Sequence, residues 1–291
     1  MTGSVAPEPI EGPRATVADA LRSATARLAK TSDTARLDAE VLMAHALGVS
    51  RSDVLLRHMR DPAPLAFADL VERRAAAEPV AYITGEQEFF GRTFAVSPAV
   101  LIPRGDSETP VAAALEARPD ARRVLDCGTG SGALLLTLLA ELPGARGVGI
   151  DCSQAALEVA ARNAAALGLD DRCELREADW TKPGWTGGLG TFDLIIANPP
   201  YVEDDAQLAP DVRDHEPHGA LFAGREGLEA YRALVPQLRA LLDPEGVAVL
   251  EIGFAQADAV SAIAHGAGFT AELRRDLGGR PRALILRATR R

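Results

Sequence analysis

The stretch from Asn198 to Tyr201 reads Asn-Pro-Pro-Tyr and follows a short apolar run at residues 194–196. The run predicts a strand buried on both faces, which the prolines end because they donate no backbone hydrogen bond. The side-chain carbonyl of Asn198 and the backbone carbonyl of Pro199 can accept both hydrogens of an amide or aniline-like NH₂ group, a poor nucleophile. Pro200 adds no competing donor, and Tyr201 offers an aromatic face. The tetrapeptide predicts a site that orients a planar nitrogen, with an ordinary Asn-Pro turn as the alternative.

A glycine-rich stretch, Gly128-Thr-Gly-Ser-Gly132, follows another short apolar run. Glycines at this spacing let the backbone approach a ligand closely where a strand gives way to a helix. Asp151 comes 19 residues after Gly132, about where an acid accepts ribose hydroxyls in dinucleotide-binding folds. Through Ala133 the stretch also matches G-x-G-x-x-G/A, so a dehydrogenase is an alternative.

Three features favour S-adenosylmethionine (SAM) over a dinucleotide. Asp126 stands just before the glycines, where it would meet a positive group rather than a pyrophosphate. Asp179 and Trp180 follow a third predicted strand and offer a carboxylate to an adenine amino group and a ring to its edge. Asn198 begins the tetrapeptide where a methyl acceptor is expected. For Asp126 and Asp151 the alternative is a helix-capping acid. The predicted cofactor-binding residues are Asp126, Gly128, Thr129, Gly130, Ser131, Gly132, Asp151, Asp179, Trp180 and Asn198.

The elements that position these residues follow from periodicity. Apolar residues at helical spacing predict helices from Thr16, from Thr34 to Gly48, and from Pro64 to Ala77, with a short helix capped by Ser50 or Ser52 between the last two. From Arg123 onward, strands alternate with helices, which predicts a parallel, doubly wound α/β sheet. The predicted organisation is a disordered lead at 1–15, a helical N-terminal domain for partner recognition at 16–78, a β-hairpin linker around Gly91 at 79–104, and a cofactor-binding domain at 105–291.

Composition narrows the function classes. The 291 residues carry a formal net charge of −10, which argues against binding a polyanion by general electrostatics. The sequence shows neither a run long enough to span a membrane nor a signal peptide. Cys127, Cys152 and Cys173 lack metal-ligand spacing, so no metal is expected. We interpret Cys127 and Cys152 as small core residues of a protein in a reducing cytosol.

These residues resemble the HemK/PrmC-type release factor glutamine N5-methyltransferases from about Thr16 to the end of the chain. The family's blocks are matched at 79–85, 101–104, 126–132, 179–180, 198–201, 216–217, 220–221, 251–253 and 276–280. The family usually reads Pro-Arg-Pro-Asp-Thr-Glu where this chain has Gly105 for the second proline and Ser107 for the threonine. Asp214-His-Glu-Pro217 is also more polar than the family's pattern.

The resemblance implies a small all-helical domain, a β-hairpin linker and a seven-stranded Rossmann-like class I SAM-dependent methyltransferase domain whose last strand is antiparallel. It also implies the reaction, transfer of the SAM methyl group to the side-chain nitrogen of the glutamine in the Gly-Gly-Gln motif of peptide-chain release factors, leaving S-adenosylhomocysteine. Catalysis is expected from Asn198, Pro199 and Tyr201, and substrate binding from these residues with Pro200. We expect a cytoplasmic monomer that binds neither nucleic acid nor membrane. An adenine-N6 nucleic-acid methyltransferase and a non-catalytic SAM-binding scaffold are the alternatives.

Overall fold

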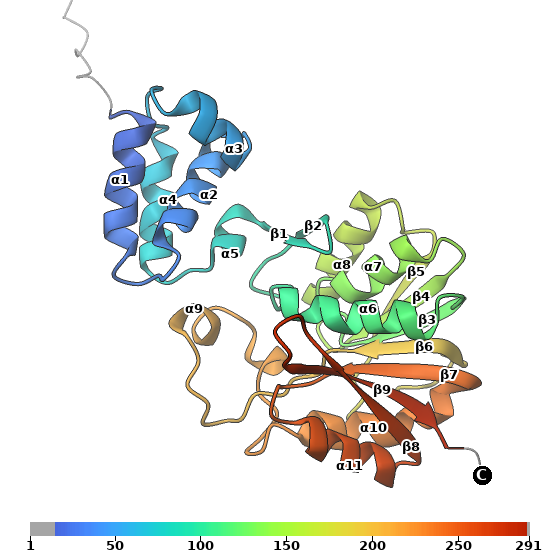
Figure 1. Ribbon diagram of the computed structural model, residues 1–291. Helices are drawn as coiled ribbons and strands as arrows, with labels where there is room; N and C mark the ends of the chain where they lie inside the picture. The colour runs from blue at the N-terminus through green and yellow to red at the C-terminus, as the bar shows by residue number, and fades with distance from the viewer. Residues whose placement is uncertain (1–14, 290–291) are drawn as a thin grey trace, which may run out of the picture. The chain divides into compact units, whose positions relative to one another are not determined.

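The computed structural model describes residues 15–289, which fall into two compact units, one ending at Thr84 and one beginning at Gly85 (Figure 1). Apart from Ala15, the predicted disordered lead lies outside the described residues. Residues 15–84 are entirely helical apart from turns and a single bridge, whereas residues 85–289 contain both β-sheets. Each unit has its own apolar core, because one buried cluster lies within 17–83 and the other two lie within 89–286.

The N-terminal unit forms where caps and apolar spacing predict helices. Its elements are α1 (Val17–Leu28), α2 (Ala35–Leu47), α3 (Arg51–Asp53), the π-helical turn η1 (Val54–His58), α4 (Ala66–Ala75) and α5 (Val80–Thr84). The Thr16 side chain caps α1, and Ser50, rather than Ser52, caps α3. Gly48 ends α2 in the left-handed conformation, with φ of 65°. The fourth helix begins two residues later than Pro64.

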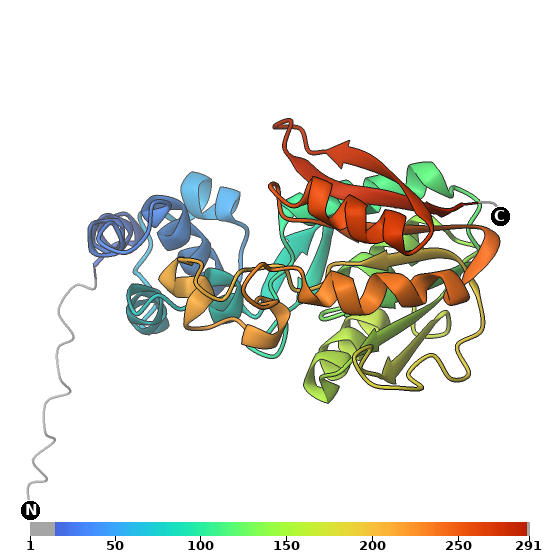
Figure 2. The same cartoon turned by 90° about the horizontal axis from the view of Figure 1, so that it is seen from below.

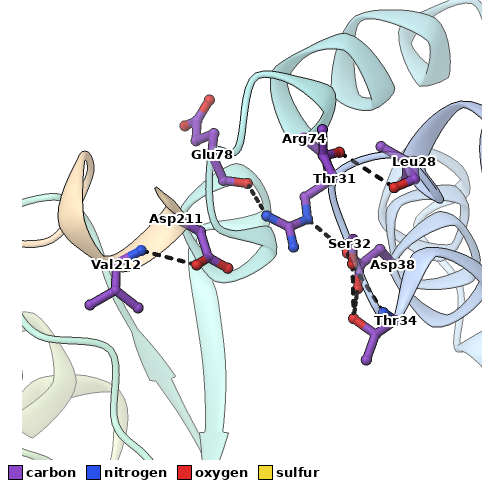
Figure 3. Close-up of polar contacts among 9 residues, drawn as sticks. All are labelled: Leu28, Thr31, Ser32, Thr34, Asp38, Arg74, Glu78, Asp211 and Val212. Atoms are coloured by element: carbon purple, nitrogen blue, oxygen red, sulfur yellow. Dashed lines mark hydrogen bonds and ion pairs between the residues drawn. The ribbon is translucent and has the colours of Figure 1, made fainter. Parts of the chain in front are cut away.

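A buried ion pair stabilises the packing of α2 against α4 (Figure 3). The Nε of Arg74 donates to Oδ2 of Asp38 over 2.7 Å, and both side chains are about one-tenth exposed. Ser32 and Thr34 also donate to the Asp38 carboxylate, each over 2.8 Å. Because a buried carboxylate is costly without partners, loss of Arg74 should destabilise this unit more than loss of a surface pair.

The hairpin around Gly91 is shorter than the sequence predicts. Strands β1 (Glu86–Phe89) and β2 (Arg92–Ala95) pair across Phe90 and Gly91, both of which have positive φ, as a two-residue hairpin turn requires. Residues 80–84, which lie within the predicted hairpin linker at 79–104, form the helix α5. The hairpin was predicted from alternating apolar residues around Gly91, but at this end of the linker the Pro79 carbonyl accepts helical hydrogen bonds from the amides of Tyr82 and Ile83, whose side chains are buried. Residues 96–104 contain no strand.

The second unit is built on a seven-stranded sheet of order β5-β4-β3-β6-β7-β9-β8. The strands are β3 (Arg123–Cys127), β4 (Arg146–Asp151), β5 (Cys173–Glu177), β6 (Phe192–Ala197), β7 (Leu242–Glu251), β8 (Phe269–Arg275) and β9 (Pro281–Ala288). Neighbours from β5 to β7 are parallel, and β9 runs antiparallel to both β7 and β8. The predicted doubly wound sheet with an antiparallel last strand is therefore confirmed.

Helices cover both faces of this sheet (Figures 1 and 2). One face carries α6 (Glu108–Ala117), α7 (Ala133–Glu141) and α8 (Gln154–Ala166), and the other carries α10 (Glu229–Leu241) and α11 (Ala257–Gly266). Three short helices lie in the connections, η2 (Gly105–Ser107), α9 (Pro210–Arg213) and η3 (His218–Ala220). This layering leaves the carboxyl ends of the parallel strands for a ligand.

Alternation along β6 explains its apolar sequence. Leu194 and Ile196 pack into the cluster under α6 and α7, whereas Ile195 and Ala197 pack into the cluster under α10 and α11. A strand buried on both faces needs apolar residues at every position. The same environment buries Cys127, but Cys152, which we expected in the core, is exposed just beyond the end of β4. The core interpretation of Cys152 was wrong because the strand ends one residue before it.

Candidate active site

A cavity of about 440 Å³ lies at the carboxyl ends of β3, β4 and β6. This volume falls within the range of ligand-binding pockets in proteins, roughly 300–1,000 Å³. Of the residues predicted from the sequence, most contribute to its wall. These are Gly128, Thr129, Gly130, Ser131, Asp151, Asp179, Trp180, Asn198 and Pro200. Asp126, Gly132, Pro199 and Tyr201 do not contribute to the wall and lie in the layer behind it.

The glycine turn is held against the end of β4 by its own backbone. Gly128 and Thr129 both donate to the carbonyl of Ile150, over 2.8 and 2.9 Å. Two glycines are required sterically: a Cβ at Gly128 would lie 3.0 Å from the Trp180 ring, and one at Gly132 would lie 2.9 Å from Leu136, both at positive φ. The turn therefore passes between the aromatic ring on one side and α7 on the other.

Asp151 ends β4 and connects the glycine turn to the next helix. Its Oδ2 accepts from the Gly130 amide and its Oδ1 from the Ser153 amide, each over 2.9 Å. Each carboxylate oxygen retains a second lone pair. Asp151 is partly exposed and lines the cavity, so its carboxylate is placed to accept further hydrogen bonds, such as those of a ribose.

Asp179 and Trp180 form the next part of the wall. Oδ1 of Asp179 accepts from the amide and the hydroxyl of Thr181, over 2.8 and 2.6 Å, and these bonds lower the pKa of Asp179. The carboxylate is therefore ionised at neutral pH and suited to a donor such as an adenine amino group. Gln237 donates to the Trp180 carbonyl over 2.9 Å, which fixes the backbone that carries the ring.

The sequence predicts that Asp126 contacts the cofactor, but this residue is not part of the cavity wall. It is completely buried beneath the glycine turn, where Oδ2 accepts from the Thr129 hydroxyl over 2.7 Å. Its Oδ1 has no hydrogen-bond partner within the described part of the chain. Burial raises the pKa of Asp126 to about 7, although the Thr129 hydrogen bond lowers it. The Asp126 carboxylate therefore does not reach the cavity itself. It positions the glycine turn and the Thr129 hydroxyl, which line the cavity.

We expect Asp126→Asn to flatten the dependence of stability on pH. Since folding raises the pKa of Asp126 from 3.8 to about 7, the folded protein keeps a proton that the unfolded chain releases, and stability falls as pH rises through this window. Asparagine carries no such proton. Unfolding free energies measured in urea at pH 5 and pH 8 should differ less for Asp126→Asn than for the unmodified protein. Equal differences in the two proteins would refute the buried, protonated state of Asp126.

Asn198 follows the last residue of β6, and its side chain lies in the cavity wall. No residue within 15–289 forms a hydrogen bond with its side-chain amide. The turn that carries it is held from behind: Val202 donates to the Leu221 carbonyl over 2.8 Å, and Gln256 donates to the Tyr201 carbonyl over 3.0 Å. The amide of Asn198 is therefore fixed through its backbone while its polar atoms stay available to a ligand.

Tyr201 lies behind the wall rather than in it. Its half-buried ring packs against the apolar cluster under α10, and its hydroxyl lies 3.4 Å from Oε1 of Glu251. Burial raises the pKa of Tyr201, so the phenol stays protonated and acts as a donor. The sequence predicts that the Tyr201 ring contacts the substrate. In the structure, Tyr201 instead supports the turn that carries Asn198.

The structure adds polar residues to which the sequence assigned no role. Arg104 and Ser107 line the cavity. Glu216, buried, forms an ion pair with Arg104 and accepts from the Ile102 amide over 3.2 Å. Asn163 on α8 donates to the Ser131 carbonyl over 2.8 Å and exchanges two hydrogen bonds with Ala95. The matched family block at residues 216–217 was the available signal for Glu216, but its partner Arg104 lies 112 positions away.

Within residues 15–289, no group of three His, Cys, Asp or Glu side chains is arranged to hold a metal ion. No described helix has the length and apolarity needed to cross a bilayer.

Comparison with known proteins finds two matching family models. Residues 19–85 match the PrmC N-terminal domain, and residues 119–263 match a methyltransferase domain. A release factor glutamine methyltransferase from Cereibacter sphaeroides is 46% identical, with 93% of this chain and 98% of that protein covered. One from Bradyrhizobium diazoefficiens is 40% identical, with 96% and 94% covered. Among solved structures, a ribosomal protein L11 methylase from Lactobacillus delbrueckii subsp. bulgaricus shares the fold, with a TM-score of 0.50 and 21% identity over 70% of this chain and 90% of that one.

Proposed function

Because this chain belongs to the release factor glutamine methyltransferases, we propose that it methylates the side-chain nitrogen of the glutamine in the Gly-Gly-Gln motif of peptide-chain release factors. It is a SAM-dependent methyltransferase of the class I fold. The observation that carries the proposal is the cavity wall, which combines a nucleoside-binding end with an unengaged side-chain amide at Asn198. An acceptor amide and a sulfonium donor can meet there.

The residues of the wall fit SAM. Asp151 and Asp179 supply carboxylates for the ribose hydroxyls and the adenine amino group, and Trp180 supplies a ring beside the glycine turn. A Cβ at Gly130 would meet no atom within 4 Å, so the turn leaves open space for the methionine end. The buried Asp126, with one unpartnered oxygen, lies beneath the glycine turn. When bound, SAM supplies an electrophilic methyl group.

The chemical difficulty lies with the acceptor, because resonance withdraws the lone pair of an amide nitrogen. Asn198 and the Pro199 carbonyl accept its two hydrogens and hold the nitrogen for in-line attack. Positioning of this kind can lower a barrier by about 7–11 kcal/mol. No strong general base is needed, because the methylated amide nitrogen is a strong acid until it releases a proton.

We expect Asp151→Ala to weaken SAM binding by roughly 1–3 kcal/mol, the cost of leaving ribose hydroxyls unpaired. Calorimetric titration measures the affinity. Asp170→Ala is the matched control, because Asp170 is an exposed acid in the turn before β5 and is not part of the cavity wall. Unchanged affinity in Asp151→Ala would remove this residue from the cofactor site, and binding of NAD in place of SAM would overturn the methyltransferase mechanism.

The substrate is tested by mass spectrometry after incubation of the protein with labelled SAM and a release factor. We expect one added methyl group on the Gly-Gly-Gln glutamine and none on a factor in which that glutamine is alanine. Labelled adenine in DNA or RNA offered in parallel would favour the nucleic-acid alternative, which the net charge of −10 argues against. Labelling of no acceptor, with SAM bound, would favour the non-catalytic scaffold. The proposal includes a cytoplasmic monomer as the active form.

A further inference from the structure

Glu251 is a fully buried acid beside the methyl-acceptor end of the cavity. It is the last residue of β7, whose preceding residue, Leu250, pairs in register with Ala197 of β6. Asn198 directly follows Ala197, and Glu251 directly follows Leu250, so the two residues lie at the adjacent ends of two parallel strands. Glu251 is 1% exposed, and one of its oxygens, Oε2, has no partner among residues 15–289. Such burial without full hydrogen bonding is costly, which makes a purely stabilising role a poor explanation for an acid here.

The side chains of Tyr201 and Ser107 both affect the Glu251 carboxylate. The Tyr201 hydroxyl lies 3.4 Å from Oε1, at the far end of the turn that begins with Asn198. Ser107 lowers the pKa of Glu251, against the larger effect of burial. Ser107 is 4% exposed and belongs to the cavity wall, directly before α6. The carboxylate thus contacts the far end of the turn that begins with Asn198.

Charged groups around Glu251 affect the ionisation of its carboxyl group. Arg282 on β9 is buried and pairs with Asp106 over 2.5 Å and with Asp276 over 3.2 Å. Its charge favours the ionised form of Glu251, whereas Asp106 opposes it. Burial is the larger effect and raises the pKa of Glu251 to about 7. The Tyr231 hydroxyl donates to the Glu251 backbone carbonyl over 2.8 Å, which fixes the end of the strand.

We propose that Glu251 is a positioning residue, which holds the hydroxyl of Tyr201 and thereby sets the place of Asn198 for methyl transfer. The inference rests on the proposed function, because its readout is methylation of the release factor. Glu251 itself does not touch substrate or cofactor, since it lies outside the cavity wall. Gln256 holds the same tyrosine by its backbone carbonyl over 3.0 Å, so the Glu251 contact fixes the ring end while Gln256 fixes the chain.

The test compares Glu251→Gln, Tyr201→Phe and the double variant in steady-state methylation of a release factor that the unmodified protein methylates. We expect each single variant to lower kcat about tenfold, with KM and the SAM dissociation constant changed less than about twofold, since position rather than binding is lost. Tyr201→Phe removes the contact and Glu251→Gln weakens the same contact by replacing a carboxylate acceptor with an amide oxygen, so the double variant should be no slower than Tyr201→Phe alone. Ser107→Thr, which keeps a hydroxyl, should be about fivefold faster than Ser107→Ala. Glu272→Gln, an exposed acid on β8, is the matched control.

A structural role predicts a different set of results. Since burial raises the pKa of Glu251, the acid lowers stability above pH 7, and Glu251→Gln should be at least as stable as the unmodified protein at pH 8. Lower kcat together with undiminished melting temperature supports positioning. Unchanged kcat in Tyr201→Phe, multiplicative losses in the double variant, or a loss of kcat that follows a loss of stability would each overturn the proposal. Failure of the unmodified protein to methylate a release factor would instead refute the proposed function.

Discussion

Asn198→Ala should lower kcat for release factor methylation by about 100-fold or more, equivalent to about 2.7 kcal/mol of activation free energy. Asn198 is the side chain in the cavity wall whose amide is left without hydrogen bonds by residues 15–289. Its loss removes the acceptor that orients the glutamine nitrogen, whereas the groups expected to hold the nucleoside lie on other strands. The dissociation constant of SAM should therefore change much less than kcat.

Asn198→Asp provides the matched comparison, because it keeps an acceptor oxygen and adds charge. We expect it to retain more activity than Asn198→Ala. Single-turnover methylation of an intact release factor, with SAM affinity measured by calorimetry, separates orientation from binding. Normal turnover in Asn198→Ala would show that this residue serves only to end the strand.

A chain beginning at Gly85 should remain folded and bind SAM with unchanged affinity, but methylate an intact release factor with a KM about 30-fold higher, or about 2 kcal/mol. The buried clusters of the sheet unit lie within residues 89–286, and that of the helical unit lies within 17–83, so neither core depends on the other for its residues. All residues of the cavity wall also follow Gly85. The helical unit contributes no residue to the cavity wall, and we propose that it recognises the folded substrate.

The KM should rise because the shortened chain offers a smaller contact area to the release factor. A single peptide loop buries too little surface for specific binding, and stable interfaces bury roughly 1,200–2,000 Å² in total. A short Gly-Gly-Gln peptide should be an equally poor substrate for the full chain and for the shortened one, and it serves as the control. An unchanged KM for the intact factor would reject the docking role. Insolubility of the shortened chain would instead favour a helical unit that covers an apolar surface.

Short-range physics accounts for most of what the sequence predicted. Strand β6 is apolar at every residue from Leu194 to Ala197 because both of its faces are buried. Pro199 and Pro200 end that strand whatever surrounds it, so the position of Asn198 at a strand end followed from adjacent residues alone. The glycine turn and Asp151 could be placed in the same way. The antiparallel last strand and the identity of the acceptor came from resemblance to a family and not from residue patterns.

Packing between residues far apart in the sequence decided the features that the sequence did not predict. Residues 80–84 have a strand-like composition but form a helix, because Tyr82 and Ile83 find apolar surroundings in that conformation. Asp126 lies near the end of one predicted strand and Cys152 just beyond another, yet Asp126 is completely buried and Cys152 is exposed. Local sequence cannot distinguish them, since burial depends on which helix and turn cover each strand end.

The polar groups behind the cavity wall show this limit most clearly. Tyr201 and Glu251 are 50 residues apart, and Arg104 and Glu216 are 112 residues apart. Each pair exists because the order and register of the parallel strands bring separate connections to one edge of the sheet. The sequence determined that Asn198 stands at a strand end, because two prolines act on their immediate neighbour. Only the tertiary structure decided what holds that side chain in place, because hydrogen bonds between distant segments depend on the register of the whole sheet.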